Sequence, residues 1–203
     1  MRAVTLAGIF VVVAGCSGAA EPEGETGRRV PGTGDRGQGM AKKEGDELIG
    51  RPAPGWQLET WFNSKPLALE ELRGKVVLVR WFMSPDCPFC SATAPSLNLL
   101  DERYRQRGLT VLGFYHHKGA EPMMAEAVKG YLEHYRFRFP VAIDPDWKTL
   151  KRWWLDRERA WTSVSFLLDK QGVIRFIHPG GKYAPGSPEL AEIEKKIQAL
   201  LAE

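Results

Sequence analysis

The chain has 203 residues, of which 43% are hydrophobic and 26% are charged. This balance is typical of a globular protein and excludes a disordered or fibrous chain, and the length suits one ordinary domain with additional segments. The formal net charge is only +3, and no basic stripe carries interleaved aromatic residues, so nothing indicates a nucleic-acid-binding protein.

The first sixteen residues, MRAVTLAGIFVVVAGC, have the features of a secretory signal. Arg2 precedes an apolar run over residues 3–14, which is shorter than the roughly 20 residues that a membrane-spanning helix needs. The run ends in VAGC, which resembles the lipobox of bacterial lipoproteins. The resemblance implies cleavage before Cys16 and attachment of a lipid to it. A buried strand with an unrelated cysteine is the alternative interpretation.

Residues 17–48 predict a flexible tether. They are rich in glycine and in charges of both signs, and their only large apolar residues are Val30, Met40 and Leu48. Such a segment buries too little surface to offset its ordering entropy. Signal, lipid site and tether together predict a domain anchored in the cell envelope, facing the periplasm or the exterior. Position 17 is serine, whereas many lipoproteins that stay at the inner membrane have aspartate there. This difference favours the outer membrane in a Gram-negative cell.

Residues 49–203 predict a folded domain that begins with short strands. The stretch GWQLETWFNSKPLAL predicts two short strands around a turn at Asn63 and Ser64. Residues 76–82 form a nearly continuous apolar run, which is typical of a buried parallel strand. A helix is expected after this run, and residues 109–115 predict the next strand. A strand–helix–strand order of this length predicts that the two strands are parallel.

The second half of the domain predicts alternating helices and strands. A helix is expected over residues 122–135, followed by a short strand in FPVAID and a helix capped by Asp146. The segment SVSFLLDKQGVIRFIH predicts a hairpin. Ser187 as N-cap and Pro188 as first helical residue predict the start of the last helix.

This order, βαβ followed by ββα with a C-x-x-C pair after the first core strand, resembles the thioredoxin fold. The closer resemblance is to the TlpA/ResA-like thiol–disulfide oxidoreductases, and it is carried by GRPAPGWQL, ALEELRGKVVLV, CPFC, FPVAIDPD and FLLDKQGVIRF. It covers roughly residues 50–203. It implies an α/β domain with a central mixed sheet flanked by helices, here with an N-terminal hairpin and an inserted helix–strand–helix.

The resemblance also implies an enzyme that exchanges disulfides with protein thiols and disulfides, needs no cofactor, and is recharged by a membrane or soluble electron donor. Cys87 is expected at the helix N-terminus, where the helix dipole and free N–H groups favour the thiolate, and Cys90 one turn further in is suited to resolve the mixed disulfide. The alternatives are a static disulfide or half of a zinc site, although a structural zinc site normally has four ligands.

Several residues around the pair depart from the family pattern. Asp86 precedes the first cysteine and its charge opposes a thiolate there, and Arg80 stands on the strand where thioredoxins carry an acid. Ser163, preceded by Thr162, occupies the position of the family's cis-proline. With Pro88 and Phe89, which lie between the cysteines, Thr162 and Ser163 are the residues expected to line the substrate groove.

Two other functions stay open at this point. His116 and His117 follow a strand that should neighbour the cysteine strand, and two cysteines with a histidine would suit copper, as in thioredoxin-fold chaperones of the Sco type. Those proteins space their cysteines by three residues, whereas Cys87 and Cys90 are separated by two. A peroxiredoxin would need proline at position 80 and threonine at 84, where this chain has Arg80 and Ser84.

Overall fold

The structure is a computed structural model that describes residues 43–119, 123–155, 159 and 161–203. The expected signal, Cys16 and nearly all of the expected tether lie outside these residues. The α-helices are α1 (Pro88–Tyr104), α2 (Ala125–Tyr135), α3 (Lys148–Trp153) and α4 (Pro188–Ala202). The strands are β1 (Trp61–Phe62), β2 (Val76–Phe82), β3 (Leu109–Tyr115), β4 (Val141–Ile143), β5 (Ser165–Leu168) and β6 (Ile174–His178). Among the helices so described, none is both long and apolar enough to cross a membrane.

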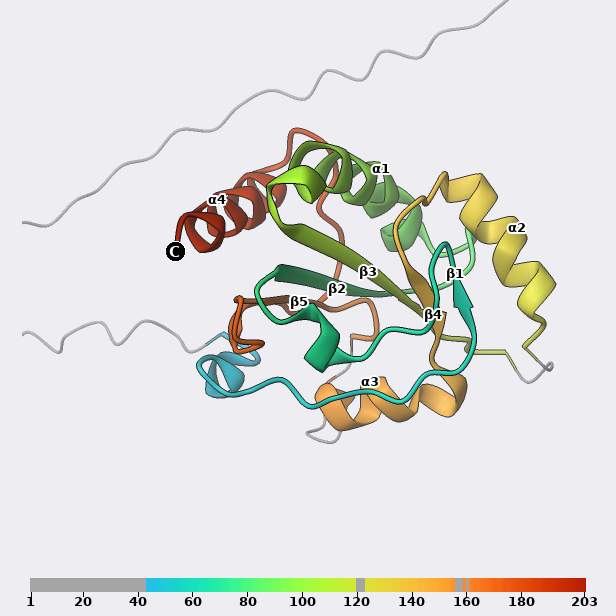
Figure 1. Ribbon diagram of the computed structural model, residues 1–203. Coiled ribbons are helices and arrows are strands. Elements are labelled where there is room, and N and C mark those ends of the chain that lie inside the picture. The colour runs from blue at the N-terminus through green and yellow to red at the C-terminus, as the bar shows by residue number, and fades with distance from the viewer. Residues whose placement is uncertain (1–42, 120–122, 156–158, 160) are drawn as a thin grey trace, which may run out of the picture. The chain divides into compact units, whose positions relative to one another are not determined.

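The strands form one mixed sheet in the order β1-β4-β3-β2-β5-β6. β2 lies near its centre, parallel to β3 and antiparallel to β5, and each of its residues is buried (Figure 1). The parallel pairing of β2 with β3, the hairpin of β5 with β6, and the inserted α2–β4–α3 confirm the fold predicted from the sequence. In this fold the cysteine loop follows the C-terminal end of β2, so it lies near the centre of the sheet and not beside an edge strand.

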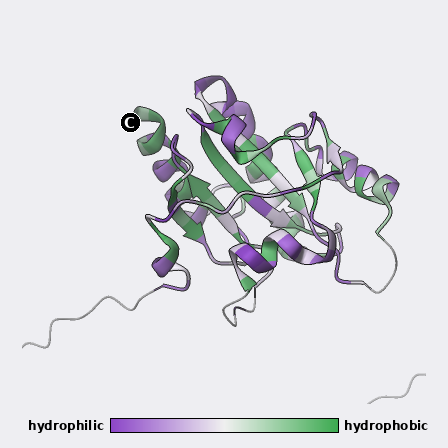
Figure 2. Cartoon of the chain, turned by 60° about the horizontal axis from the view of Figure 1, so that its bottom comes forward, coloured by the Kyte–Doolittle hydropathy of each residue, from purple (hydrophilic) through white to green (hydrophobic). Residues whose placement is uncertain are grey.

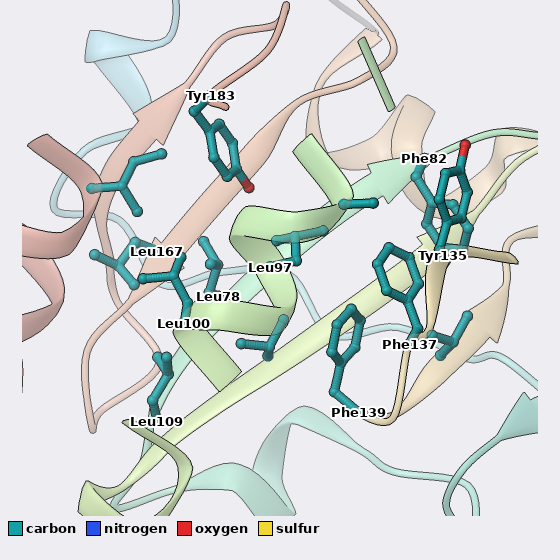
Figure 3. Close-up of a cluster of buried hydrophobic side chains, with 14 of the residues drawn as sticks. Leu78, Phe82, Leu97, Leu100, Leu109, Tyr135, Phe137, Phe139, Leu167 and Tyr183 are labelled. Carbon is teal, nitrogen blue, oxygen red and sulfur yellow. The ribbon is translucent and has the colours of Figure 1, made fainter. Parts of the chain in front are cut away.

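Apolar side chains cover both faces of the sheet. Because neighbouring residues of a strand point to opposite faces, Leu78 and Phe82 belong to a core beneath α1, α2 and α4, whereas Val79 and Trp81 belong to a core beside α3 (Figures 1 and 3). Figure 2 shows that the strands are mainly hydrophobic, in green, whereas much of the helical surface is hydrophilic, in purple. Burial on both faces explains why β2 reads as a continuous apolar run rather than an alternating one.

Two expectations for the start of the domain are wrong. The N-terminal hairpin does not form, because Trp61–Phe62 pairs with β4 and the chain then enters a 3-10 helix at Leu69–Leu72 instead of a second strand. Regular structure is also present before residue 49. Asp46–Leu48 form a 3-10 helix, and the preceding Gly45 is buried so closely that a Cβ there would lie 2.9 Å from the Trp154 ring.

The caps of two helices test the residue-level predictions. Ser187 caps α4 as expected, since its hydroxyl accepts from the Leu190 N–H at 3.2 Å. Asp146 does not cap α3. The buried Asp144 does so, accepting from the N–H groups of Thr149 and Leu150, each at 2.8 Å. Asp144 also accepts from the Trp81 indole N–H at 3.0 Å, so one carboxylate joins β2 to α3.

Candidate active site

The two cysteines stand at the start of α1, as the sequence predicts. Cys87 is the N-cap residue and Pro88 is the first helical residue, a position that suits proline because its missing N–H would have no partner there. The Cys87 sulfur accepts from the Cys90 N–H at 3.3 Å and is partly exposed, whereas Cys90 is 3% exposed. Both residues carry free thiols. The outer sulfur is therefore accessible and stabilised by a helix N–H, and the inner sulfur lies beneath it.

Cys90 is held in an environment that favours its neutral form. Burial is the main cause that raises its pKa to about 12, and the hydrogen bond and charge of Cys87 act in the same direction. The N–H of Met83 donates to the Cys90 sulfur at 3.4 Å and opposes this shift, as does the charge of Arg80. Cys90 is thus protonated while both cysteines are reduced. Its thiolate must be stabilised before Cys90 can act as a nucleophile.

A groove of about 380 Å³ opens beside Cys87. Its lining brings together all four residues expected there from the sequence, Pro88, Phe89, Thr162 and Ser163, although the two pairs come from distant segments. Larger hollows of about 660 and 740 Å³ lie along α1 and α2 but contain neither cysteine. Because Cys87 lines it, the smaller groove is the candidate substrate groove.

Five lining residues were not predicted as part of the groove, namely Met83, Ser84, Asp86, Lys118 and Trp161. Trp161 is the most exposed of the large aromatic residues there, at 44%, and its ring lies edge-on to that of Phe89 with centroids 5.5 Å apart. Its carbonyl accepts from the Trp154 indole N–H at 2.8 Å, which fixes the backbone. The only sequence signal for Trp161 is its place two residues before the family's proline position.

Tyr135 supports the loop that carries Cys87. Its hydroxyl lies 2.9 Å from the carbonyl of Ser84 and 3.3 Å from that of Met83, in both cases as the donor. Burial raises its pKa, so the phenol stays protonated and keeps this donor. α2 therefore stabilises the cysteine loop, a role that the helical pattern alone did not indicate.

The two histidines do not join the cysteines. Alternation along β3 puts His116 on the face of Leu112 and Phe114, away from α1, where its ring packs against Trp147 at 5.3 Å. His116 is fully buried, and burial lowers its pKa to about 3. His117 instead lies 3.4 Å from the Tyr115 hydroxyl. Among the described residues no three His, Cys, Asp or Glu side chains are grouped to hold a metal ion, so the copper site of Cys87, Cys90, His116 and His117 is not assembled.

Known thiol–disulfide exchange proteins are similar to this chain in sequence and in fold. The AhpC/TSA family model matches residues 49–177. A thiol-disulfide oxidoreductase ResA from Bacillus cereus is 29% identical over 137 residues, covering 68% of this chain and 73% of ResA. A crystal structure of a thioredoxin-like superfamily protein is 28% identical with a TM-score of 0.61, covering 75% of this chain and 97% of that one. A thiol-disulfide isomerase from Corynebacterium glutamicum is 25% identical with a TM-score of 0.58, covering 74% and 97%. The chain therefore belongs to the AhpC/TSA family and is a ResA-like thiol–disulfide oxidoreductase of the thioredoxin fold.

Proposed function

We propose that the protein exchanges disulfides with protein substrates through Cys87 as the attacking residue and Cys90 as the resolving one. The observation that carries this assignment is the difference between the two sulfurs at the start of α1. Cys87 opens on the groove and accepts a helix N–H, whereas Cys90 is buried behind it. Only the outer sulfur is accessible to a bulky disulfide, and the helix N-terminus supports its thiolate.

The exchange balances in two steps. The Cys87 thiolate attacks one sulfur of a substrate disulfide, which breaks the substrate S–S bond, forms a mixed disulfide and releases the other substrate sulfur as a thiolate. Cys90 then loses its proton to water and attacks the Cys87 sulfur. The substrate leaves as its second thiolate and takes up a proton, so that the substrate is reduced by two electrons and the Cys87–Cys90 pair is oxidised. Run backwards, the same steps oxidise a substrate dithiol.

Trapping tests this assignment. In cells that produce Cys90→Ser, mixed disulfides with protein substrates should accumulate on non-reducing gels and disappear when a reductant is added, because no internal thiol resolves them. Cys87→Ser should trap almost nothing, and Cys16→Ser serves as the matched control with the pair intact. Adducts that formed only with Cys87→Ser would reverse the roles. If neither variant trapped a protein and the wild type did not turn over a disulfide, the proposal would be disproved.

We also propose that this domain works outside the cytoplasm as a lipoprotein. The support is the lipobox-like VAGC, which ends at Cys16, and the glycine-rich, charged segment after it. Signal cleavage before Cys16 and a tether that ends near residue 43, where the described chain begins, would leave the domain free to meet protein substrates in the envelope. An electron donor in the membrane or in the same compartment would then recharge the pair.

A further inference from the structure

Arg80 is a fully buried arginine on the central strand without a described carboxylate partner. One terminal nitrogen donates to the Ser165 hydroxyl at 3.3 Å, the other to the Gly181 carbonyl at 2.8 Å, and Nε has no hydrogen-bond partner. The guanidinium carbon lies 5.2 Å from the centre of the Tyr183 ring. All of these partners are neutral. Since arginine stays charged, the fold buries a positive charge that nothing described here neutralises.

Arg80 lies in the same layer as Cys90. Alternation along β2 places it with Leu78 and Phe82 on the face that α1 covers. The residue directly after the strand, Met83, donates its N–H to the Cys90 sulfur at 3.4 Å. The residue that contacts the resolving sulfur therefore directly follows the strand that carries the buried charge.

The two histidines on which the Arg80 charge acts are neutral. Burial lowers the pKa of His116 to about 3 and that of His178 to about 4, so neither carries a positive charge at pH 7. Lys118 is a cation that lines the groove beside Cys87. Tyr183, on the loop after β6, and Tyr135, on α2, are kept protonated because burial raises the pKa of each phenol. Among the described groups that act on Cys90, Arg80 supplies the positive charge.

We infer that Arg80 is a positioning residue of the exchange reaction, whose charge supports the Cys90 thiolate while Cys90 resolves the mixed disulfide. The inference rests on the proposed function. Two of the three influences that oppose the Cys90 thiolate come from the hydrogen bond and charge of Cys87, and a Cys87 sulfur bonded to substrate has no charge. Burial is then opposed by the Met83 N–H and by Arg80. During resolution of the mixed disulfide, the buried Arg80 cation thus gains the Cys90 thiolate as a counter-charge, and the thiolate gains a cation that stabilises it.

The two thiol steps can be timed separately with 5,5′-dithiobis(2-nitrobenzoate) in a Cys16→Ser background. Attack by Cys87 releases one coloured thiolate in a phase whose rate depends on reagent concentration, and resolution by Cys90 releases the second in a phase that does not. Arg80→Gln keeps polar contacts without the charge, and Arg80→Lys keeps the charge. Arg103→Gln removes an arginine charge from a partly exposed side chain on α1 and is the matched control.

Arg80→Gln should slow the second phase about tenfold at pH 7, the effect of one pKa unit on the thiolate fraction, and leave the first phase within about threefold. Arg80→Lys and the control should keep the second phase within about threefold of wild type. A second phase of wild-type speed in Arg80→Gln would overturn the inference. So would an Arg80→Lys variant as slow as Arg80→Gln when both are folded by near-ultraviolet circular dichroism, because the shape of the arginine would then matter rather than its charge.

If Arg80→Gln does not fold, Arg80→Met, which replaces the charged side chain with an apolar one of similar length, supplies the test. Its second phase should be about tenfold slower than that of the wild type at pH 7, with the first phase within about threefold. A second phase of wild-type speed in Arg80→Met would overturn the inference. Failure of the proposed function looks different, because the wild type would then release no coloured thiolate from Cys87, or only one per protein.

Discussion

The Trp161 ring stands edge-on to the Phe89 ring beside Cys87, with centroids 5.5 Å apart and planes at 86°. Phe89 comes from the first turn of α1 and Trp161 from the segment before β5, so the fold joins two exposed aromatic rings at the rim of the groove. An edge-to-face pair is a preferred aromatic geometry and leaves an apolar surface that a flexible segment of a protein substrate could cover.

Removal of this surface should affect protein substrates more than small ones. Trp161→Ala should lower kcat/KM for a protein disulfide about fivefold to tenfold, the equivalent of about 1 kcal/mol of lost aromatic contact. Its rate with 5,5′-dithiobis(2-nitrobenzoate) should change less than twofold. Ile49→Ala, which truncates another exposed apolar side chain, is the control. Equal losses for both kinds of substrate would mean that Trp161 acts on the cysteines and not on the partner.

Gly180 should matter because Trp161 occupies the space of a side chain there. A Cβ on Gly180 would lie 2.4 Å from Cβ and Cγ of Trp161, a contact that cannot be accommodated without movement. Gly180→Ala should displace the indole and reproduce the selective loss of Trp161→Ala with protein substrates, together with a change in tryptophan fluorescence. Gly130→Ala, on α2 with open space around it, should change neither. Wild-type activity in Gly180→Ala would show that the position of the indole is unimportant.

Acid should destabilise the domain through His116. Its pKa is about 3 in the folded state and near 6.5 when unfolded, so between these values the unfolded chain binds more protons and stability falls as pH falls. Going from pH 7 to pH 4 should cost up to about 3 kcal/mol at this residue. Urea unfolding at both pH values should show a smaller acid loss for His116→Leu than for wild type, whereas the exposed His134→Leu should resemble wild type. Identical acid losses in His116→Leu and wild type would contradict this account.

Asp144 and Asp146 should differ sharply in their contributions to stability. Asp144→Ala removes the cap of α3 and leaves the buried Trp81 N–H unpaired, which should lower the free energy of unfolding by about 3 kcal/mol. Asp146→Ala removes an exposed side chain whose ion pair with Lys148 spans 3.8 Å, so it should cost less than about 0.5 kcal/mol. Denaturant titration measures both. Equal costs would mean that the cap is not made by Asp144.

Cys16 should decide where the protein is found. Wild type should take up labelled fatty acid and sediment with membranes, and Cys16→Ser should do neither, because the lipid-bearing thiol is gone. Cys90→Ser leaves the signal intact and controls for loss of a cysteine as such. A wild-type protein recovered from the cytoplasm without lipid would contradict the lipoprotein proposal.

Much of the fold could be predicted because its signals are local. The apolar run of β2 and the Ser187–Pro188 start of α4 each depend on side-chain periodicity or capping within a few residues. The predicted hairpin failed because a two-residue strand such as Trp61–Phe62 carries little periodicity and takes its partner, β4, from far along the chain.

The sequence by itself determined that two cysteines stand at the start of a helix after a buried strand, because spacing, proline and periodicity act at short range. Only the tertiary structure decided what surrounds them. It turned His116 to the opposite face of the sheet, brought Trp161 to Phe89, and buried Arg80 on the face of β2 that α1 covers. These outcomes depend on which segments pack together and on which face each strand residue occupies, and no pattern within one segment contains that information.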